Sequence, residues 1–162
     1  MSSSSPQPTG HLVGNDLVLA RSFRAPIGDV WDSVTRPEKT ALWFGGWEGE
    51  PGPGKTVRLQ LVHEQGQPWC DLRIEECEAP RHLVVSMVDA HGAWRIRLSL
   101  EQAGDTTELR FVQHLSDRQL AGDVGPGWEY YLDMLVAARE GAPLPSFSDY
   151  YPAMKAHYLA GA

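Results

Sequence analysis

Residues 17–45 read LVLARSFRAPIGDVWDSVTRPEKTALWFG, and this stretch decides the fold class. Its first seven residues alternate, with Leu17, Leu19 and Phe23 on one face, which predicts a β-strand. Proline suits the first position of a helix, so Pro26 and Pro37 each predict a helix start. The apolar stripe of the first helix consists of Ile27, Val30, Trp31 and Val34. The stretch therefore predicts one strand followed by two short helices.

After this stretch the apolar period becomes that of β-strands. Five segments alternate or are apolar throughout: 57–61, 70–75, 83–88, 94–100 and 109–113. The short connections between them are typical of consecutive hairpins. A long amphipathic helix is predicted over 126–140, ended by Gly141 and Pro143. Strands in the middle of the chain and helices toward its ends predict an α+β domain with an antiparallel sheet.

Two groups of residues carry a family resemblance. The first group is Arg21-Ser22-Phe23-Arg24-Ala25-Pro26, Val30-Trp31, Thr35-Arg36-Pro37-Glu38 and Trp43-Phe44-Gly45, and the second is Gly127-Trp128 with Leu132 and Leu135. In this order and spacing they resemble the START-like superfamily, also called SRPBCC, which includes polyketide cyclases. Within it the chain is most similar to the branch of the activator of heat-shock protein 90 ATPase. The resemblance covers residues 17–140.

The resemblance implies the helix-grip fold: a curved antiparallel sheet wrapped around a long C-terminal helix, with two short helices after the first strand. It also implies a cavity between that helix and the sheet. Members of the superfamily use this cavity for lipids, polyketides, hormones or other apolar molecules, and some use it for catalysis. Arg36 departs from the family pattern, because an aspartate usually stands there and would cap the second helix.

We expect three parts in the chain. Residues 1–14 are expected to form a flexible tail, because they are polar and rich in Ser and Pro at their start. Residues 15–141 form the START-like domain. Residues 142–162 carry aromatic side chains outside the family pattern, and we expect this extension to pack on the domain or on a partner. The partner could be a second copy of the chain, so a homodimer is one of the expected alternatives.

Composition narrows the classes of function. The chain has 21 acidic and 14 basic residues and a net charge of −7, so it lacks the basic footprint of nucleic-acid binding. It has no secretory signal and no apolar run of about 20 residues, which predicts a cytoplasmic protein without a membrane span. No spacing typical of a metal or cofactor site occurs, so neither is expected. If the strand predicted at 70–75 continues to Cys77, the odd spacing of Cys70 and Cys77 places them on opposite faces and too far apart for a disulfide, so two free thiols are predicted.

Aromatic and amphipathic residues are the candidates for ligand contact, because six tryptophans in 162 residues predict an aromatic interior. The candidate ligand-binding residues are Trp47, Trp69, Trp94, Gln113, Trp128, Tyr131, Leu135 and Arg21. The alternative for the tryptophans is a filled aromatic core. Alternation points Arg21 inward, where it needs an anionic partner, and we favour a structural ion pair over a ligand acid. Gln113 either contacts a ligand or marks the end of the buried part of its strand.

These observations favour a cytosolic protein that binds a small apolar or aromatic ligand between the sheet and the C-terminal helix. One alternative, implied by the family branch, is a co-chaperone-like regulator of a heat-shock protein ATPase. Another is a cyclase, aromatase or hydrolase acting on an apolar substrate, which requires polar side chains that converge inside the cavity. Arg21, Asp71, Gln113 and Tyr131 are the candidates for that convergence, and no recognisable catalytic motif occurs.

Overall fold

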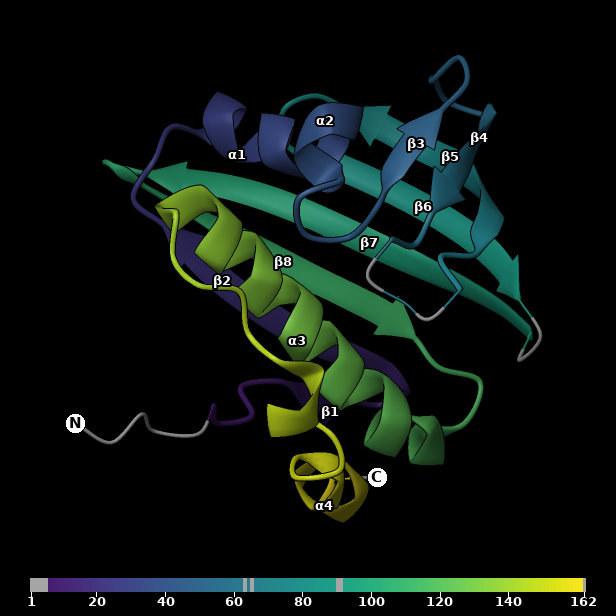
Figure 1. Ribbon diagram of the computed structural model, residues 1–162, viewed down its shortest axis with the longest axis vertical. Helices are drawn as coiled ribbons and strands as arrows, with labels where there is room; N and C mark the ends of the chain where they lie inside the picture. Colours follow the sequence, from purple (N-terminus) through teal and green to yellow (C-terminus); the bar gives the residue numbers. More distant parts are fainter. Residues whose placement is uncertain (1–5, 63, 65, 90–91, 162) are drawn as a thin grey trace.

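A computed structural model describes residues 6–62, 64, 66–89 and 92–161. Over these residues, eight strands form one antiparallel sheet in the order β1-β2-β8-β7-β6-β5-β4-β3. The strands are β1 (His11–Val13), β2 (Asp16–Phe23), β3 (Gly46–Glu48), β4 (Thr56–Gln60), β5 (Trp69–Glu78), β6 (His82–Asp89), β7 (Gly92–Ala103) and β8 (Thr106–His114). The α-helices are α1 (Ile27–Thr35), α2 (Pro37–Thr40), α3 (Ala121–Glu140) and α4 (Lys155–Ala160). The long helix α3 lies across one face of the curved sheet (Figure 1).

The predicted fold class is confirmed: the domain is α+β, with two short helices after the strand β2 and a long helix gripped by the sheet. Helix α1 buries the apolar stripe predicted from its spacing, including Val30 and Val34. Arg36 precedes α2 without a side-chain capping bond, and its guanidinium instead lies 3.2 Å from Asp32. Among the described residues, no helix is long and apolar enough to cross a membrane.

Helix α3 begins at Ala121, five residues before the predicted start at Pro126. The Asp117 carboxylate accepts the main-chain N–H of Gln119 at 2.9 Å and caps a 3-10 turn, Arg118–Leu120, that leads directly into α3. Ala121 is fully buried, so packing holds the first turn although Pro126 cannot donate a main-chain hydrogen bond within the helix. Capping and packing therefore outweigh the proline signal.

Two short strands occupy segments in which no strand was predicted. β1 lies within residues 1–14, the expected flexible tail, and pairs with β2 through His11 and Val18. β3 follows α2 and pairs with β4 through Trp47 and Leu59. A strand of three residues shows too little alternation to be recognised in a sequence, so pairing with a longer neighbour defines it.

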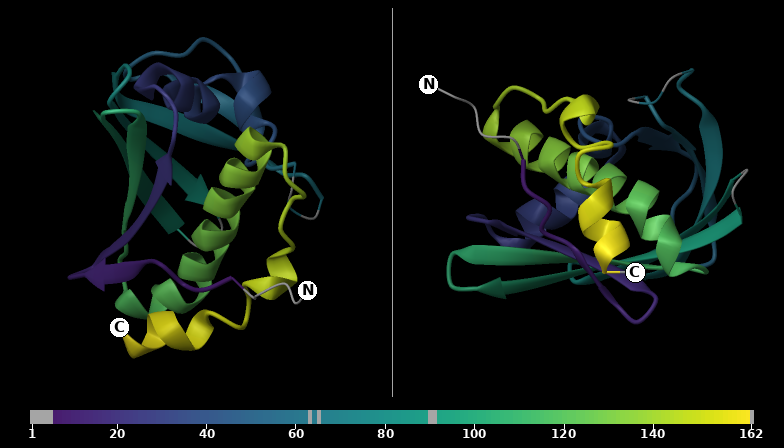
Figure 2. Two further views of the ribbon diagram at one scale, coloured as in Figure 1. Left: turned by 90° about the vertical axis from the view of Figure 1, so that its left-hand side faces the viewer. Right: turned by 90° about the horizontal axis from the view of Figure 1, so that it is seen from below.

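The C-terminal segment 147–160 begins on the side of α3 that faces away from the sheet and ends in α4, which lies against the N-terminal half of α3 beside Gly10 (Figure 2). Its side chains Tyr150, Met154 and Tyr158 are buried. The ring of Tyr158 packs directly on the backbone of Gly125 in α3, where a Cβ atom would lie 2.6 Å from the ring. Both sides of α3 are therefore covered, one by the sheet and the other by the chain's own C-terminal segment.

This packing predicts opposite effects for two neighbouring glycines of α3. Gly125→Ala is expected to lower the free energy of unfolding by about 1–3 kcal/mol, because the new methyl group displaces Tyr158. Gly127→Ala meets nothing within 4 Å and is expected to raise it by about 0.5–1 kcal/mol, because alanine favours the helix. Urea unfolding of both variants measures the difference, and equal effects would contradict this packing.

Candidate functional site

A cavity of about 160 Å³ lies between α3 and the facing side of the sheet, and we call it the inner compartment. Strands β4–β8 supply Val57, Leu59, Leu72, Ile74, Leu83, Val85, Met87, Ile96, Leu98, Leu109 and Phe111. Helix α3 supplies Trp128 and Leu132, and the segment from α1 to β3 supplies Val34, Thr35, Thr40, Trp43, Phe44 and Trp47. None of the described lining residues is charged. The sheet's alternation produces this wall, because one side chain in two faces α3.

Polar groups at the inner compartment are bonded to the protein itself. The hydroxyl of Thr35 donates to the main-chain oxygen of Trp31 at 2.7 Å, and that of Thr40 to the oxygen of Pro37 at 3.3 Å. The indole N–H groups of Trp43 and Trp47 donate to main-chain oxygens near the end of α1, at 2.8 and 2.9 Å. These bonds fix the rings, so the compartment offers a ligand mainly apolar and aromatic surface.

A larger and more polar hollow of about 610 Å³ adjoins the first, and we call it the outer compartment. It lies toward the N-terminal half of α3 and is lined by Trp69, Cys70, Trp94, Gln113, His114, Leu115, Asp123, Val124 and Tyr131, among others. Phe44, Met87 and Trp128 line both compartments. These three side chains therefore form the partition between a ring-sized apolar cavity and a wider, partly charged one.

Aromatic contacts centre on Trp128 of that partition. Its ring centroid lies 4.5 Å from Phe111, 5.6 Å from Phe44, 5.6 Å from Tyr131 and 6.1 Å from Trp94. Tilted and edge-on arrangements at such distances are favourable between aromatic rings. The partition is thus one aromatic cluster that joins α3 to the sheet.

Two polar side chains of the outer compartment have defined partners. Gln113, only 5% exposed, accepts the indole N–H of Trp128 at its Oε1 atom, at 2.8 Å. The hydroxyl of Tyr131 donates to Glu64 at 2.7 Å. Burial, and then the hydrogen bond and negative charge of Glu64, raise the pKa of Tyr131 above its usual value. Tyr131 therefore stays a neutral hydrogen-bond donor at physiological pH.

Neither Cys70 nor Cys77 forms a disulfide within the described residues, and both lie on the same face of β5, not on the opposite faces that their odd spacing predicted. The register of β5 against β6 shifts between Ile74 and Glu76, which inserts one extra residue. Beyond this bulge Cys77 pairs with Leu83 and faces the inner compartment, while Cys70 faces the outer one.

The structure brings most of the predicted site residues together. Trp47 lines the inner compartment, Trp69, Trp94, Gln113 and Tyr131 line the outer one, and Trp128 lines both. Leu135 is fully buried in the hydrophobic core and is not among the described residues that line either compartment. Arg21 also lies away from both compartments.

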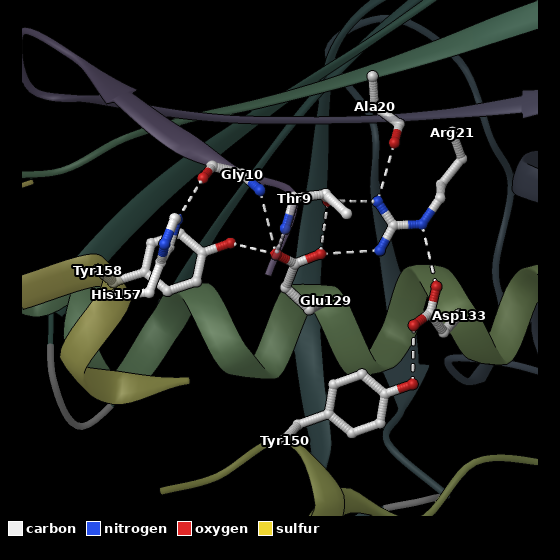
Figure 3. Close-up of polar contacts among 9 residues, drawn as sticks. All are labelled: Thr9, Gly10, Ala20, Arg21, Glu129, Asp133, Tyr150, His157 and Tyr158. Carbon is white, nitrogen blue, oxygen red and sulfur yellow. Dashed lines mark hydrogen bonds and ion pairs between the residues drawn. The ribbon is translucent and has the colours of Figure 1, made fainter. Parts of the chain in front are cut away.

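Arg21 belongs to a polar cluster on the side of α3 that faces the termini (Figure 3). Its guanidinium lies 2.8 Å from Glu129 and 3.0 Å from Asp133, so its partners are helix carboxylates. The fully buried Glu129 also accepts hydrogen bonds from the main chain of residues 9–10 and from the hydroxyl of Tyr158. We call these residues the Glu129 cluster; it ties both terminal segments to the helix that closes the cavity.

Sequence reasoning missed the buried role of Glu129, which is not among the candidate residues drawn from the sequence. The sequence signal that could have pointed to Glu129 is the alternation that directs Arg21 to the buried face, because a buried arginine needs an acidic partner. It also missed that Cys77 lines the inner compartment. Cys77 faces the compartment because of the bulge in β5, and a strand sequence gives no reliable signal of a bulge. Among the described residues, no group of three His, Cys, Asp or Glu side chains could hold a metal ion.

Comparison with known proteins gives the family. The family model described as "Activator of Hsp90 ATPase homolog 1-like protein" matches residues 24–140, which is most of the chain. The chain belongs to this family. With its helix-grip fold, this member of the Hsp90-activator homolog family also belongs to the START-like superfamily. A search of curated proteins finds no match.

Solved structures show the same fold. CalU16 from Micromonospora echinospora is 27% identical, with a TM-score of 0.75, over 90% of this chain and 86% of that one. BPP1335 from Bordetella parapertussis is 24% identical, with a TM-score of 0.74, over 99% and 93%. DynU16, described as a protein in the dynemicin biosynthetic locus, is 19% identical, with a TM-score of 0.69, over 86% of this chain and 51% of that one. The Hsp90-activator homolog fold thus extends over nearly the whole chain.

Proposed function

We propose that this protein binds a small apolar or aromatic molecule in the inner compartment, with the rest of the molecule extending into the outer one. One observation carries the proposal: a ring-sized cavity lined by apolar side chains, in which the described threonine and indole groups are already bonded to the protein. A dry apolar cavity of about 150 Å³ is large enough to bind benzene. The two compartments together fall within the range of about 300–1,000 Å³ usual for small-molecule sites.

The candidate ligand contacts follow from this arrangement. Trp47 and Trp128 present ring surface to the apolar part of the ligand, and Trp69, Trp94 and Tyr131 surround the part in the outer compartment. Leu135 supports the helix from within the core rather than by direct contact. The cytoplasmic location and the absence of a cofactor stay predictions.

The two alternative functions have weaker support. A catalytic role needs at least two polar groups that converge with shifted pKa values, and the described threonines of the inner compartment are held by their own helices. A role at a chaperone is favoured by the description of the family, a homologue of an activator of Hsp90 ATPase. A pull-down with the chaperone tests whether the two proteins associate, and the chaperone's ATPase rate with and without this protein tests whether it acts as a regulator.

Binding of butylbenzene tests the leading proposal, because its ring matches the inner compartment in size and its chain is apolar. We expect saturable one-to-one binding in equilibrium dialysis, together with a rise in the midpoint of thermal unfolding as ligand concentration increases. A ligand that binds only the folded state must stabilise it, so the two measurements check each other. Absence of binding, or uptake of many copies without saturation, would contradict the proposal.

A further inference from the structure

The amide of Gln113 has an orientation that the neighbouring indole decides. An indole N–H can only donate, so the atom that faces Trp128 must be the amide oxygen. The amide nitrogen, Nε2, is then the free end of the side chain, and it carries two donor hydrogens. Among the described residues Nε2 has no hydrogen-bond partner, yet it does not count as a buried atom without a partner, so it is open to the outer compartment that Gln113 lines.

A donor that is open to a hollow can bond either water or an acceptor group of a ligand that enters the hollow. Gln113 lies on β8 next to the partition and lines the outer compartment, which adjoins the inner one. A ligand that fills the apolar cavity with one end therefore places its other end near this donor. The inner cavity of about 160 Å³ holds one ring, so any larger ligand has such a second end.

The charges around the outer compartment indicate what kind of acceptor fits. Glu64 and Asp123 line it, and the imidazole of His114 bonds to Asp16 at 2.9 Å. Lys155 lies 3.5 Å from Asp123 and offsets part of its charge. A ligand carboxylate would still meet Glu64, since like charges at close range are unfavourable. A neutral acceptor has no such cost.

We propose that the ligand carries a neutral carbonyl group, as in a ketone, ester or amide, which accepts a hydrogen bond from Nε2 of Gln113 while an apolar ring occupies the inner compartment. This inference rests on the proposed function and adds the chemical class of the ligand to it. Gln113 selects the ligand in this account, and the aromatic partition positions it.

Three matched probes test the inference: 4-phenylbutan-2-one, butylbenzene and 3-phenylpropanoate. They share a phenylethyl group, to which the ketone adds a carbonyl and a methyl group, the hydrocarbon a methylene and a methyl group, and the acid a carboxylate. Affinities are measured by equilibrium dialysis on the wild-type chain and on Gln113→Leu. We expect the ratio of ketone to hydrocarbon affinity to fall about five- to tenfold in Gln113→Leu, because the carbonyl loses its donor. The carboxylate is expected to bind the wild type more weakly than the ketone.

Gln113→Leu leaves the Trp128 indole without its acceptor, which could disturb the structure and change binding indirectly. A second pair of variants controls for this effect. Trp128→Phe and the double variant Gln113→Leu/Trp128→Phe differ only in Gln113, and neither carries an indole N–H at position 128. The same fall in the ratio is expected between them. An unchanged ratio in both comparisons, or tightest binding of the carboxylate, overturns this inference and leaves the proposed function standing. Failure of butylbenzene and the ketone alike to bind contradicts the proposed function and the inference with it.

Discussion

Glu129→Gln is expected to lower the free energy of unfolding by about 3 kcal/mol. Glu129 is fully buried, and its carboxylate accepts hydrogen bonds from residues 9–10, Arg21 and Tyr158. The amide replaces one acceptor oxygen by a donor and leaves Arg21 with Asp133 as its remaining ion-pair partner. Removing one partner of a buried ion pair commonly costs about 3–5 kcal/mol, because the other charge stays buried without compensation. Urea unfolding measures the loss.

Glu140→Gln is the matched control, because Glu140 lies at the exposed end of the same helix. It is expected to change the free energy of unfolding by less than about 0.5 kcal/mol. Equal effects of the two substitutions would show that the Glu129 cluster contributes little to stability.

The same carboxylate predicts how stability depends on pH. Burial acts to raise the pKa of Glu129, but hydrogen bonds from Tyr158, Arg21 and Thr9 outweigh it, so the pKa in the folded protein is lowered. A lowered pKa means that the stabilisation is complete above the unfolded value of about 4.3 and is lost as pH falls through the folded value. Between these two pKa values, the free energy of unfolding of Glu129→Gln should therefore fall less steeply with decreasing pH than that of the wild type.

Val85→Phe is expected to weaken butylbenzene binding at least about tenfold. Val85 lies in the central strand β6, pairs with Ile74 and Ile96, and lines the inner compartment. A phenyl ring at this position occupies the space proposed for the ligand's ring. Burial of such a group contributes about 1.5–3 kcal/mol, and the variant forfeits much of that contribution. Equilibrium dialysis measures the affinity.

Val13→Phe makes the same chemical change at a site 58% exposed and away from the cavity. It should bind butylbenzene as the wild type does, which separates loss of space from a general effect of added aromatic surface. Thermal unfolding of both variants without ligand checks that Val85→Phe still folds. Undiminished binding in a folded Val85→Phe protein would place the ligand elsewhere.

Much of the fold could be predicted because its determinants are local. Alternation defines the strands from β4 to β8, and prolines with an apolar stripe define α1 and α2. The start of α3 could not be predicted, since capping by Asp117 and burial of Ala121 override the signal of Pro126. The bulge in β5 was equally hidden, because it depends on pairing with β6 and reverses the parity of Cys77.

The candidate site could be predicted in its residue types more than in its geometry. Aromatic side chains pointed to the cavity wall, and the structure places Trp47 and Trp94 at different compartments. The sequence could not show that Trp128 and Gln113 bond across two elements, because they meet only when α3 packs on β8. Nor could it show that the chain's own terminal segments bury Glu129.

Nuclear Overhauser contacts between butylbenzene and the protein's methyl groups test the central claim most directly. We expect contacts from the phenyl protons to the methyl groups of Val85, Ile96 and Leu98, which line the inner compartment. These contacts should saturate at one ligand per chain. Contacts confined to exposed apolar residues such as Val13, Leu42 or Leu144 would contradict the claim that the cavity between sheet and helix is a binding site.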